Sequence, residues 1–472
     1  MEDMEYPVGS GQTDCFMNEQ SPSEDSFCRL SRAIIEKHGC TYAEALKLLG
    51  KLKLNLICGE EIRTSISLQA ALLTAVNAGK RSFLGGVSIS LPADVKNLLP
   101  WNTTGSLNDI VVELGGLLEQ PSFSSVSHTL YFGVTDKPVD DGLSVLCSGW
   151  RGGVVPANQQ IAFQSSHDFA TGGVLAGSMG VAKGFLRVSG LSSRFVNGPQ
   201  GFSLWRPDLE WMTAEADGPK LELLPLSLWL LGLGHLGQAY VWNLGLLPYP
   251  SSHSGKILLQ DFDRIVAANW NAGLLCDERS SGQYKTRLCS NWLAARGFDT
   301  QIVERPFDEL TRRTGEEPFI ALCGFDNIKS RSLLEDAGFD LIVECGLGGD
   351  TSNFDDILLH TFPDASQTAK KLWHNDVSKS QPSRSEAFSN AFGPTDECGI
   401  LLETLEGKAI SSSFVGAHAG AMAIGELLRG LQGGLRCELI KAQMRSNDEH
   451  GVVMLSEVYQ NRFAKSGYIA IQ

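Results

Sequence analysis

Residues 227–263 read SLWLLGLGHLGQAYVWNLGLLPYPSSHSGKILLQDFD, and this stretch decides the fold. An apolar strand leads into a glycine turn at Gly232, Gly234 and Gly237, a helix follows, and a second apolar strand ends in two carboxylates. Glycines let the backbone approach a phosphate, and the first turn of the helix offers free N–H groups. The order of elements therefore predicts a Rossmann-like α/β unit with a nucleotide site at the turn.

Asp261 and Asp263 close the second strand. An acid at this position can bind a ribose hydroxyl, in a dehydrogenase as well as in other nucleotide-binding proteins. A GxGxxG turn alone is a weak signal, so the choice between these classes depends on residues further along the chain.

Composition excludes several classes of function. The 472 residues carry a net charge of −15 without a basic patch, which disfavours nucleic acid as a partner. We expect a cytoplasmic protein without a membrane segment, because no secretory signal opens the chain and the longest apolar run, 223–233, is too short to span a bilayer. The eleven cysteines include no CxxC pair, so neither a disulfide framework nor a structural zinc site is expected.

The length suggests two to four domains, and the first part of the chain resembles the second. Residues 1–24 are polar and predicted to be disordered, and two amphipathic helices follow over 25–38 and 41–49, broken at Gly39. Strand, helix and strand are then predicted at 52–58, 67–77 and 83–91, which is a βαβ unit without the phosphate glycines.

A second similarity between the two halves indicates an internal duplication of the chain. VLAGSMGVAKGFLR, with Ala176 and Met179, matches AHAGAMAIGELLR, with Ala419 and Met422, and both are predicted helices suited to close backbone packing. The fold class expected is α/β with two Rossmann-like halves and mixed, mostly parallel sheets, the first half degenerate. The boundaries predicted are a first domain at 25–189, a linker at 190–220, a second domain at 221–430 with a crossover loop at 350–397, and a C-terminal extension at 431–472.

Polar residues downstream of the glycine turn distinguish the classes. Asn269 lies in AANWNAGLL, Lys285 opens a predicted helix, and the apolar strand in FIALCGFDNIKSR ends in Asp326 and Asn327. A hydride-transfer site needs neither the lysine nor the second acid. A site that activates a carboxylate with ATP needs both, because the lysine neutralises phosphates and the acid holds Mg²⁺.

With these motifs, residues 226–430 resemble the adenylation domain of the ThiF/MoeB/HesA superfamily, which includes ubiquitin-activating enzymes. The resemblance implies ATP-dependent adenylation of the C-terminal glycine of a protein. It implies that Asp261 holds the ribose, Asn269 and Lys285 the phosphates, and Asp326 the magnesium. The remaining residues assigned to the nucleotide are Gly232, Gly234, Gly237, Asp263 and Asn327.

The chain departs from the family at Ala272. The family usually reads SN-x-x-RQ, whereas this chain has Asn269-Trp270-Asn271-Ala272, so the arginine that stabilises the triphosphate is missing. Three explanations remain open. Arg279 reaches in from the following loop; an arginine of the first half acts across the interface, from the set Arg29, Arg32 and Arg63; or the site binds nucleotide without adenylating.

Cys398 is the second chemical candidate, in PTDECGILLETLEG. The resemblance to homodimeric activating enzymes implies that it forms a thioester with the activated modifier, since a thiolate attacks an acyl-adenylate readily. The alternative is a small buried cysteine, the usual role of this residue type.

Three functions follow, with a dinucleotide oxidoreductase as a remote fourth. The first is an activating enzyme for a ubiquitin-like protein, with a conjugating enzyme as further partner and the two halves as a pseudo-dimer; bacterial relatives of this build occur in conjugation systems linked to phage defence. The second is a sulfur-carrier or peptide adenylyltransferase without the thioester. The third is a nucleotide-binding scaffold. Whether chains also pair as a homodimer is left open.

Overall fold

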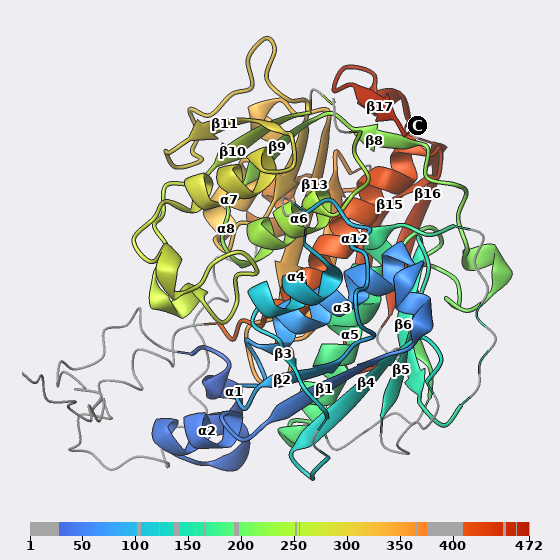
Figure 1. Ribbon diagram of the computed structural model, residues 1–472. Coiled ribbons are helices and arrows are strands. Elements are labelled where there is room, and N and C mark those ends of the chain that lie inside the picture. The colour runs from blue at the N-terminus through green and yellow to red at the C-terminus, as the bar shows by residue number, and fades with distance from the viewer. Residues whose placement is uncertain are drawn as a thin grey trace, which may run out of the picture.

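The computed structural model describes residues 28–471, apart from 102–104, 122, 136–141, 160, 162, 164–166, 193–197, 251–252, 254, 365, 375–408, 447–449 and 459. Two β-sheets lie on either side of a central layer of helices (Figure 1). In the described part of the chain, no helix combines the length and the apolar character that crossing a membrane requires.

The first sheet has seven strands in the order β3-β2-β1-β4-β5-β6-β7. Strands β1 to β5 are parallel, and β6 and β7 continue the sheet antiparallel. Their bounds are β1 Lys53–Cys58, β2 Val87–Ser90, β3 Leu117–Leu118, β4 Ser127–Phe132, β5 Leu143–Cys147, β6 Arg151–Pro156 and β7 Gln200–Ser203.

The second sheet repeats this order and adds one strand: β11-β10-β9-β12-β13-β14-β15-β16. Again the first five strands are parallel and the rest antiparallel. The bounds are β9 Ser227–Leu231, β10 Lys256–Gln260, β11 Asp299–Val303, β12 Ile320–Cys323, β13 Leu341–Leu347, β14 Asp356–Phe362, β15 Leu435–Gln443 and β16 Gly451–Val458. The predicted fold class, two Rossmann-like halves with mixed, mostly parallel sheets, is confirmed.

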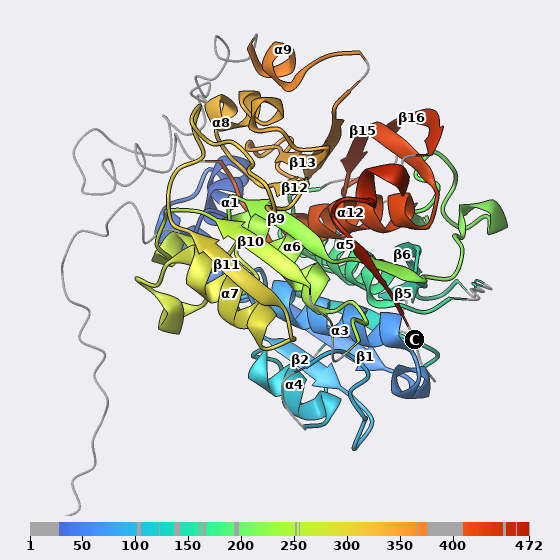
Figure 2. The ribbon, with the colours of Figure 1, turned by 90° about the horizontal axis from the view of Figure 1, so that it is seen from above.

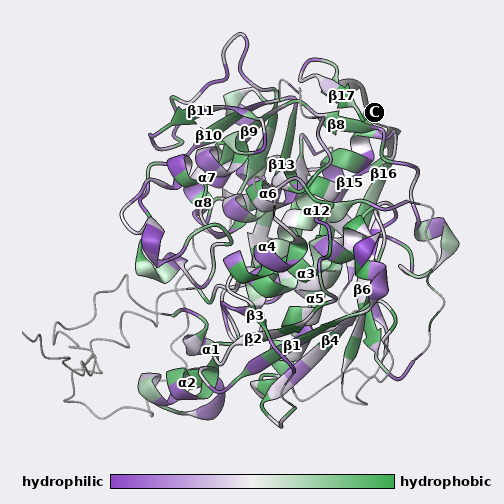
Figure 3. Ribbon diagram, viewed as in Figure 1, coloured by the Kyte–Doolittle hydropathy of each residue, from purple (hydrophilic) through white to green (hydrophobic). Residues whose placement is uncertain are grey.

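Four helices fill the space between the sheets, two from each half (Figure 2). They are α3 Ile66–Gly79 and α5 Ala170–Val188 from the first half, and α6 His235–Gly245 and α12 Ser413–Leu431 from the second. Nearly every residue of these helices is buried, and α3 and α5 are coloured largely as hydrophobic in Figure 3. Because both of their sides face protein, these helices are apolar all round rather than on a single face.

Glycines set the close spacing in this layer. A Cβ on Gly173 of α5 would lie 2.0 Å from the carbonyl oxygen of Ser67 in α3, and one on Gly177 would lie 2.3 Å from that of Ala71. The expected close backbone packing of the two small-residue helices, α5 and α12, is thereby confirmed for α5. The two helices cross where Ser178 Oγ and His418 Nδ1 are 3.2 Å apart.

The other helices lie outside this layer. Their bounds are α1 Ser31–His38, α2 Tyr42–Leu49, α4 Leu107–Glu113, α7 Lys285–Ala294, α8 Ile328–Ser332 and α9 Ala369–His374. A left-handed Gly39 separates α1 from α2, as the sequence predicts. Strands β8 Leu223–Pro225 and β17 Tyr468–Ala470 form a small sheet of their own.

Three predicted segments are organised differently. The segment 190–220 is more than a linker, because it contributes β7 to the first sheet. The extension 431–472 is part of the second half, since β15 and β16 extend its sheet. The segment 350–397 begins with β14 and α9 rather than with a continuous loop. Residues 1–24 and the rest of the predicted crossover loop lie outside the described residues.

Candidate functional site

The glycine turn connects β9 to α6 at the point where the strand order of the second sheet reverses, the usual ligand position in such sheets. Gly232 has φ +77°, a conformation that residues with side chains rarely adopt. A Cβ on Gly237 would lie 2.1 Å from the Gly232 oxygen. Gly324, after β12, also lies near this turn, because its Cβ would lie 3.1 Å from the same oxygen. The turn is therefore tightly closed, and it brings the ends of β9 and β12 together.

The N-terminus of α6 is open. Gly234 is the N-cap residue, and no side chain in the described part of the chain caps the helix. A Cβ on Gly234 would meet nothing within 4 Å, unlike one on Gly237. Backbone N–H groups at an open helix N-terminus attract anions, because the helix dipole adds a partial positive charge.

His235 follows in the first turn of α6 and is half-buried. Its ring packs on α12, where a Cβ on Gly416 would lie 2.3 Å from Nε2. Among the described residues, Nε2 has no hydrogen-bond partner and is shielded from solvent. Burial lowers the pKa of His235 to about 4, and the charge of Arg29 adds to the effect. The imidazole is therefore neutral at physiological pH.

The side chain of Asp261 accepts a hydrogen bond from the glycine turn. Its carboxylate accepts hydrogen bonds from Leu233 N at 2.6 Å and from Asp263 N at 2.8 Å. Burial raises the pKa of Asp261, and the charge of Lys285 opposes that shift. The side chain thus lies between the turn and the lysine.

Lys285 opens α7 and is buried, with Nζ 2.7 Å from Asp263 Oδ2. Its backbone N–H also donates to the Asp263 carbonyl at 3.1 Å. A buried ammonium needs such a partner because desolvation is costly. Asp263 therefore fixes where the lysine charge lies, next to Asp261.

Asp326 is exposed in the turn after β12. The residue that caps α8 is its neighbour Asn327, whose Oδ1 accepts from Ser330 N at 2.7 Å. Arg331 holds the turn by donating to the Phe325 carbonyl oxygen from Nε at 2.9 Å and from Nη2 at 2.6 Å. A Cβ on Gly232 would lie 2.9 Å from the Phe325 ring, so this turn adjoins the glycine turn.

The loop 269–276 carries Asn269 and Ala272. Asn269 Oδ1 accepts from Val266 N at 3.0 Å, which closes a short turn, and Ala272 is buried. Gln238 of α6 accepts from Leu275 N at 3.0 Å, so the loop is tied to the helix that follows the glycines.

In the first half, carboxylates occupy the position that corresponds to the N-terminus of α6. Here α3 follows β1 as α6 follows β9, but Asp168 accepts from the first two N–H groups of α3, those of Ile66 and Ser67, at 2.7 Å each. Glu61 accepts from Val134 N at 3.1 Å, between the ends of β1 and β4. Two carboxylates therefore occupy the region where the second half is open, and their charge opposes the binding of a phosphate.

Two of the arginines that could replace the missing one are paired elsewhere. Arg279 makes an ion pair with Asp277 at 2.6 Å and its side chain is 88% exposed. Arg63 pairs with Glu60 at 2.6 Å, on the first half.

The other two arginines lie on the first half where it meets the second. Arg32 pairs with Glu36 at 2.7 Å and with Asp350, after β13, at 3.3 Å. Arg29 acts electrostatically on His235 in the first turn of α6. Of the four candidates, Arg29 is the one whose charge lowers the pKa of His235, the residue that begins α6.

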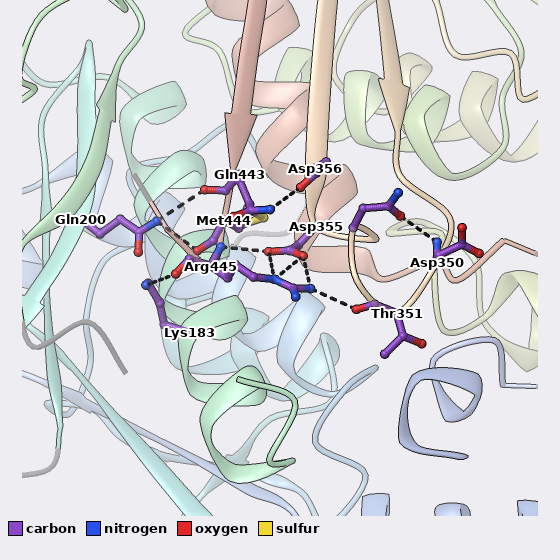
Figure 4. A network of polar contacts seen from close by, with 10 residues as sticks. Lys183, Gln200, Asp350, Thr351, Asp355, Asp356, Gln443, Met444 and Arg445 are labelled. Atoms are coloured by element: carbon purple, nitrogen blue, oxygen red, sulfur yellow. Dashed lines mark hydrogen bonds and ion pairs between the residues drawn. The ribbon is translucent and has the colours of Figure 1, made fainter. Parts of the chain in front are cut away.

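A polar network joins the halves beyond β15 (Figure 4). Lys183 of α5 donates to the Arg445 carbonyl oxygen at 2.9 Å, and Gln200 of β7 donates to that of Met444 at 3.1 Å. The guanidinium of Arg445 in turn binds the buried carboxylate of Asp355, with Nε 2.8 Å from Oδ1. The first half thus supports loops at the same edge of the second sheet as the glycine turn.

Comparisons with known proteins fit this division. The BilD N-terminal domain family matches residues 53–204, and the BilD C-terminal domain family matches residues 224–434. A Collimonas sp. protein described as bacterial E1-like protein BilD is 35% identical over 404 residues, which are 85% of this chain and 87% of that protein. The chain belongs to the BilD family. Its relationship to E1-like proteins is thereby established.

Two solved structures are also similar. The match to E. coli MccB with ATP has a TM-score of 0.32 at 15% identity and covers 49% of this chain and 63% of MccB, less than two thirds of that protein. The match to TcdA has a TM-score of 0.30 at 14% identity and covers 43% of this chain and 85% of TcdA.

The structure places three predicted site residues, Asp261, Lys285 and Asp326, around the glycine turn. Cys398 lies outside the described residues. Within the described residues, no cluster of three metal-binding side chains is present. Sequence reasoning missed Asp168, Glu61 and Gln238, each of which accepts from a backbone N–H of a segment that is distant in the chain.

Proposed function

We propose that the second half binds ATP and Mg²⁺ at the glycine turn and adenylates the C-terminal carboxylate of a ubiquitin-like protein. The observation that carries this proposal is the contrast between two equivalent helices. Among the described residues, no side chain caps the N-terminus of α6, whereas Asp168 closes that of α3. On this view the first half is the degenerate partner of a pseudo-dimer, and one chain binds one nucleotide.

Each residue has a role that suits its surroundings. Asp261 binds the ribose, since it lies at the end of β10 beside the turn. Lys285 and Asn269 bind phosphates, and Asp263 keeps the lysine in place. Asp326, exposed and next to the turn, holds Mg²⁺, and Asn327 shapes that turn. One protein carboxylate suits this ion, because Mg²⁺ in nucleotide sites takes most ligands from water and phosphates.

The reaction has two steps. A carboxylate oxygen of the modifier attacks the α-phosphorus of ATP, a new P–O bond forms, and pyrophosphate leaves. The thiolate of Cys398 then attacks the acyl carbon, a thioester forms, and AMP leaves. A conjugating enzyme would receive the modifier from this thioester. The lysine and Mg²⁺ favour the first step by neutralising charge on the phosphates.

Arg29 is our candidate for the charge that Ala272 does not supply. It belongs to the first half, and its charge reaches the first turn of α6. An arginine there would replace the missing one from the opposite side of the nucleotide.

ATP–pyrophosphate exchange tests the adenylation. We expect modifier-dependent exchange in the native chain and a rate about 100-fold or more lower in Asp326→Ala. The control Asp336→Ala changes another exposed carboxylate of this half and should exchange at the native rate. A native chain that binds ATP but catalyses no exchange would make the protein a nucleotide-binding scaffold, the role that Ala272 favours.

A second assay tests the thioester. The native chain should form a conjugate with the modifier that reducing agents release, and Cys398→Ala should not, while the control Cys40→Ala should. Exchange without any conjugate would instead support a sulfur-carrier or peptide adenylyltransferase. A conjugate that survives in Cys398→Ala would refute the assignment of this cysteine.

A further inference from the structure

The last turn of α3 reaches out of the first half and into the loop 269–276 of the second. Arg81 follows this helix and is 6% exposed. Its Nη1 donates to the carbonyl oxygen of Cys276 at 2.9 Å and also to that of Trp270, and its Nη2 donates to that of Leu274 at 3.1 Å. One guanidinium thus binds three backbone carbonyls of a single loop.

Asn77, one turn earlier on α3, completes the contact. Its Nδ2 donates to the Leu274 oxygen at 2.9 Å, and its Oδ1 accepts from Arg81 Nε at 3.3 Å. The guanidinium is planar, so its donors lie in a fixed fork. Held by Asn77 and by burial, the fork determines where the three carbonyls lie.

On its other side, the loop 269–276 is connected by hydrogen bonds to the glycine turn. Gln238 accepts from Leu275 N at 3.0 Å and donates to the Leu233 carbonyl in the glycine turn at 3.4 Å. Cys276 Sγ donates to the Asn269 carbonyl oxygen at 3.3 Å. A shift of the loop would therefore move Asn269 and disturb the turn.

We propose that Arg81 is a positioning residue for the ATP site of the other half: it acts through the loop that carries Asn269, whose backbone carbonyls its guanidinium binds. This inference rests on the proposed binding of ATP at the glycine turn. Ala272 makes the support necessary, because the family arginine at this place would let the nucleotide itself anchor the loop. The first half would then contribute to the site a structural support as well as the charge of Arg29.

Substitution of Arg81 should change the affinity for ATP more than the turnover. Arg81→Ala leaves the loop free to move, and we expect the KM for ATP in pyrophosphate exchange to rise about 10- to 100-fold. The kcat at saturating ATP should change about threefold or less, since ground state and transition state lose the same contact. Misfolding would instead lower the active fraction, and with it kcat, at an unchanged KM.

Three companion measurements make the test specific. Arg81→Lys keeps the charge but cannot bind three carbonyls, so its KM should remain raised. Millimolar guanidinium ion should lower the KM of Arg81→Ala by refilling the site. The control Arg206→Ala removes an arginine of a surface ion pair with Asp208 and should behave as the native chain does.

Direct titration with ATP separates the possible failures. If the native chain binds ATP and Arg81→Ala binds it equally well with an unchanged KM, the inference is overturned while the proposed function stands. If the native chain binds ATP without exchange, adenylation fails, and a weakened affinity in Arg81→Ala still supports the positioning role. A native chain that binds no ATP overturns both.

Discussion

Two alanine substitutions in the glycine turn should separate folding from nucleotide binding. In Gly237→Ala the new Cβ would lie 2.1 Å from the oxygen and 2.9 Å from the carbon of the Gly232 carbonyl. Ordinary contact begins at 3.4 Å, so backbone must move by more than about 1 Å. In Gly234→Ala the Cβ would meet nothing within 4 Å among the described residues, and the φ of −73° at this position is negative, unlike that of Gly232.

The structure sets the size of each effect. Overpacking costs about 1–3 kcal/mol, and replacing glycine by alanine inside a helix returns up to about 1 kcal/mol. A contact of 2.1 Å with a backbone oxygen places the overpacking cost near the upper end of its range, so Gly237→Ala should lower the free energy of unfolding by about 2 kcal/mol. Gly234 is an N-cap, where alanine costs about 1 kcal/mol at most relative to glycine. Its methyl group would, however, project into the open space that we assign to the phosphates.

Urea unfolding and titration with a fluorescent ATP analogue measure the two effects. Gly237→Ala should lose both stability and affinity, because an opened turn misplaces the N–H groups of α6. Gly234→Ala should lose affinity with little change in stability. A Gly234→Ala protein that binds ATP as tightly as the native chain would refute the location of the site, and a fully stable Gly237→Ala protein would refute the close packing of the turn.

Two further predictions concern the first half and the central layer. Asp168→Asn keeps an acceptor for only one of Ile66 N and Ser67 N and removes the charge at the helix N-terminus, so it should cost about 2 kcal/mol in urea unfolding, and calorimetry should still find one nucleotide per chain. Burial lowers the pKa of His418 to about 4, so the unfolded chain takes up a proton as the pH falls from 6.5 toward 4 while the folded chain does not, and stability is lost in that range. Between pH 7.5 and 5 the native chain should lose about 2 kcal/mol more than His418→Gln, and equal losses would contradict a buried neutral histidine.

Local patterns predicted much of the fold. The glycine turn identified the second half, because a turn with φ > 0 and a close backbone contact leaves few residue choices. The match between Ala176 and Ala419 identified two helices that have the same place in each half and the same length of 19 residues. The glycine turn and the two helices depend on residues that are close together in the chain, so a local sequence pattern is enough to predict them.

Strands at the edges of the sheets were harder to predict. The four residues of β7 lie in a segment rich in glycine and serine, and only pairing with β6 makes them a strand. The strands β15 and β16 follow α12 and join the sheet through β14, which lies about 75 residues earlier in sequence. Strand formation of this kind depends on a distant partner, which a local pattern does not contain.

The same reason explains why the contacts of α3 were missed. Asp168 closes its N-terminus, and Arg81 at its other end binds carbonyls of residues more than 180 positions away. Neither residue belongs to a motif, because their partners are backbone groups, which every residue has. Burial of the Arg81 charge would be costly without these carbonyl partners from the other half. Through Arg81 and Asn77, the first half therefore supports a loop of the second half.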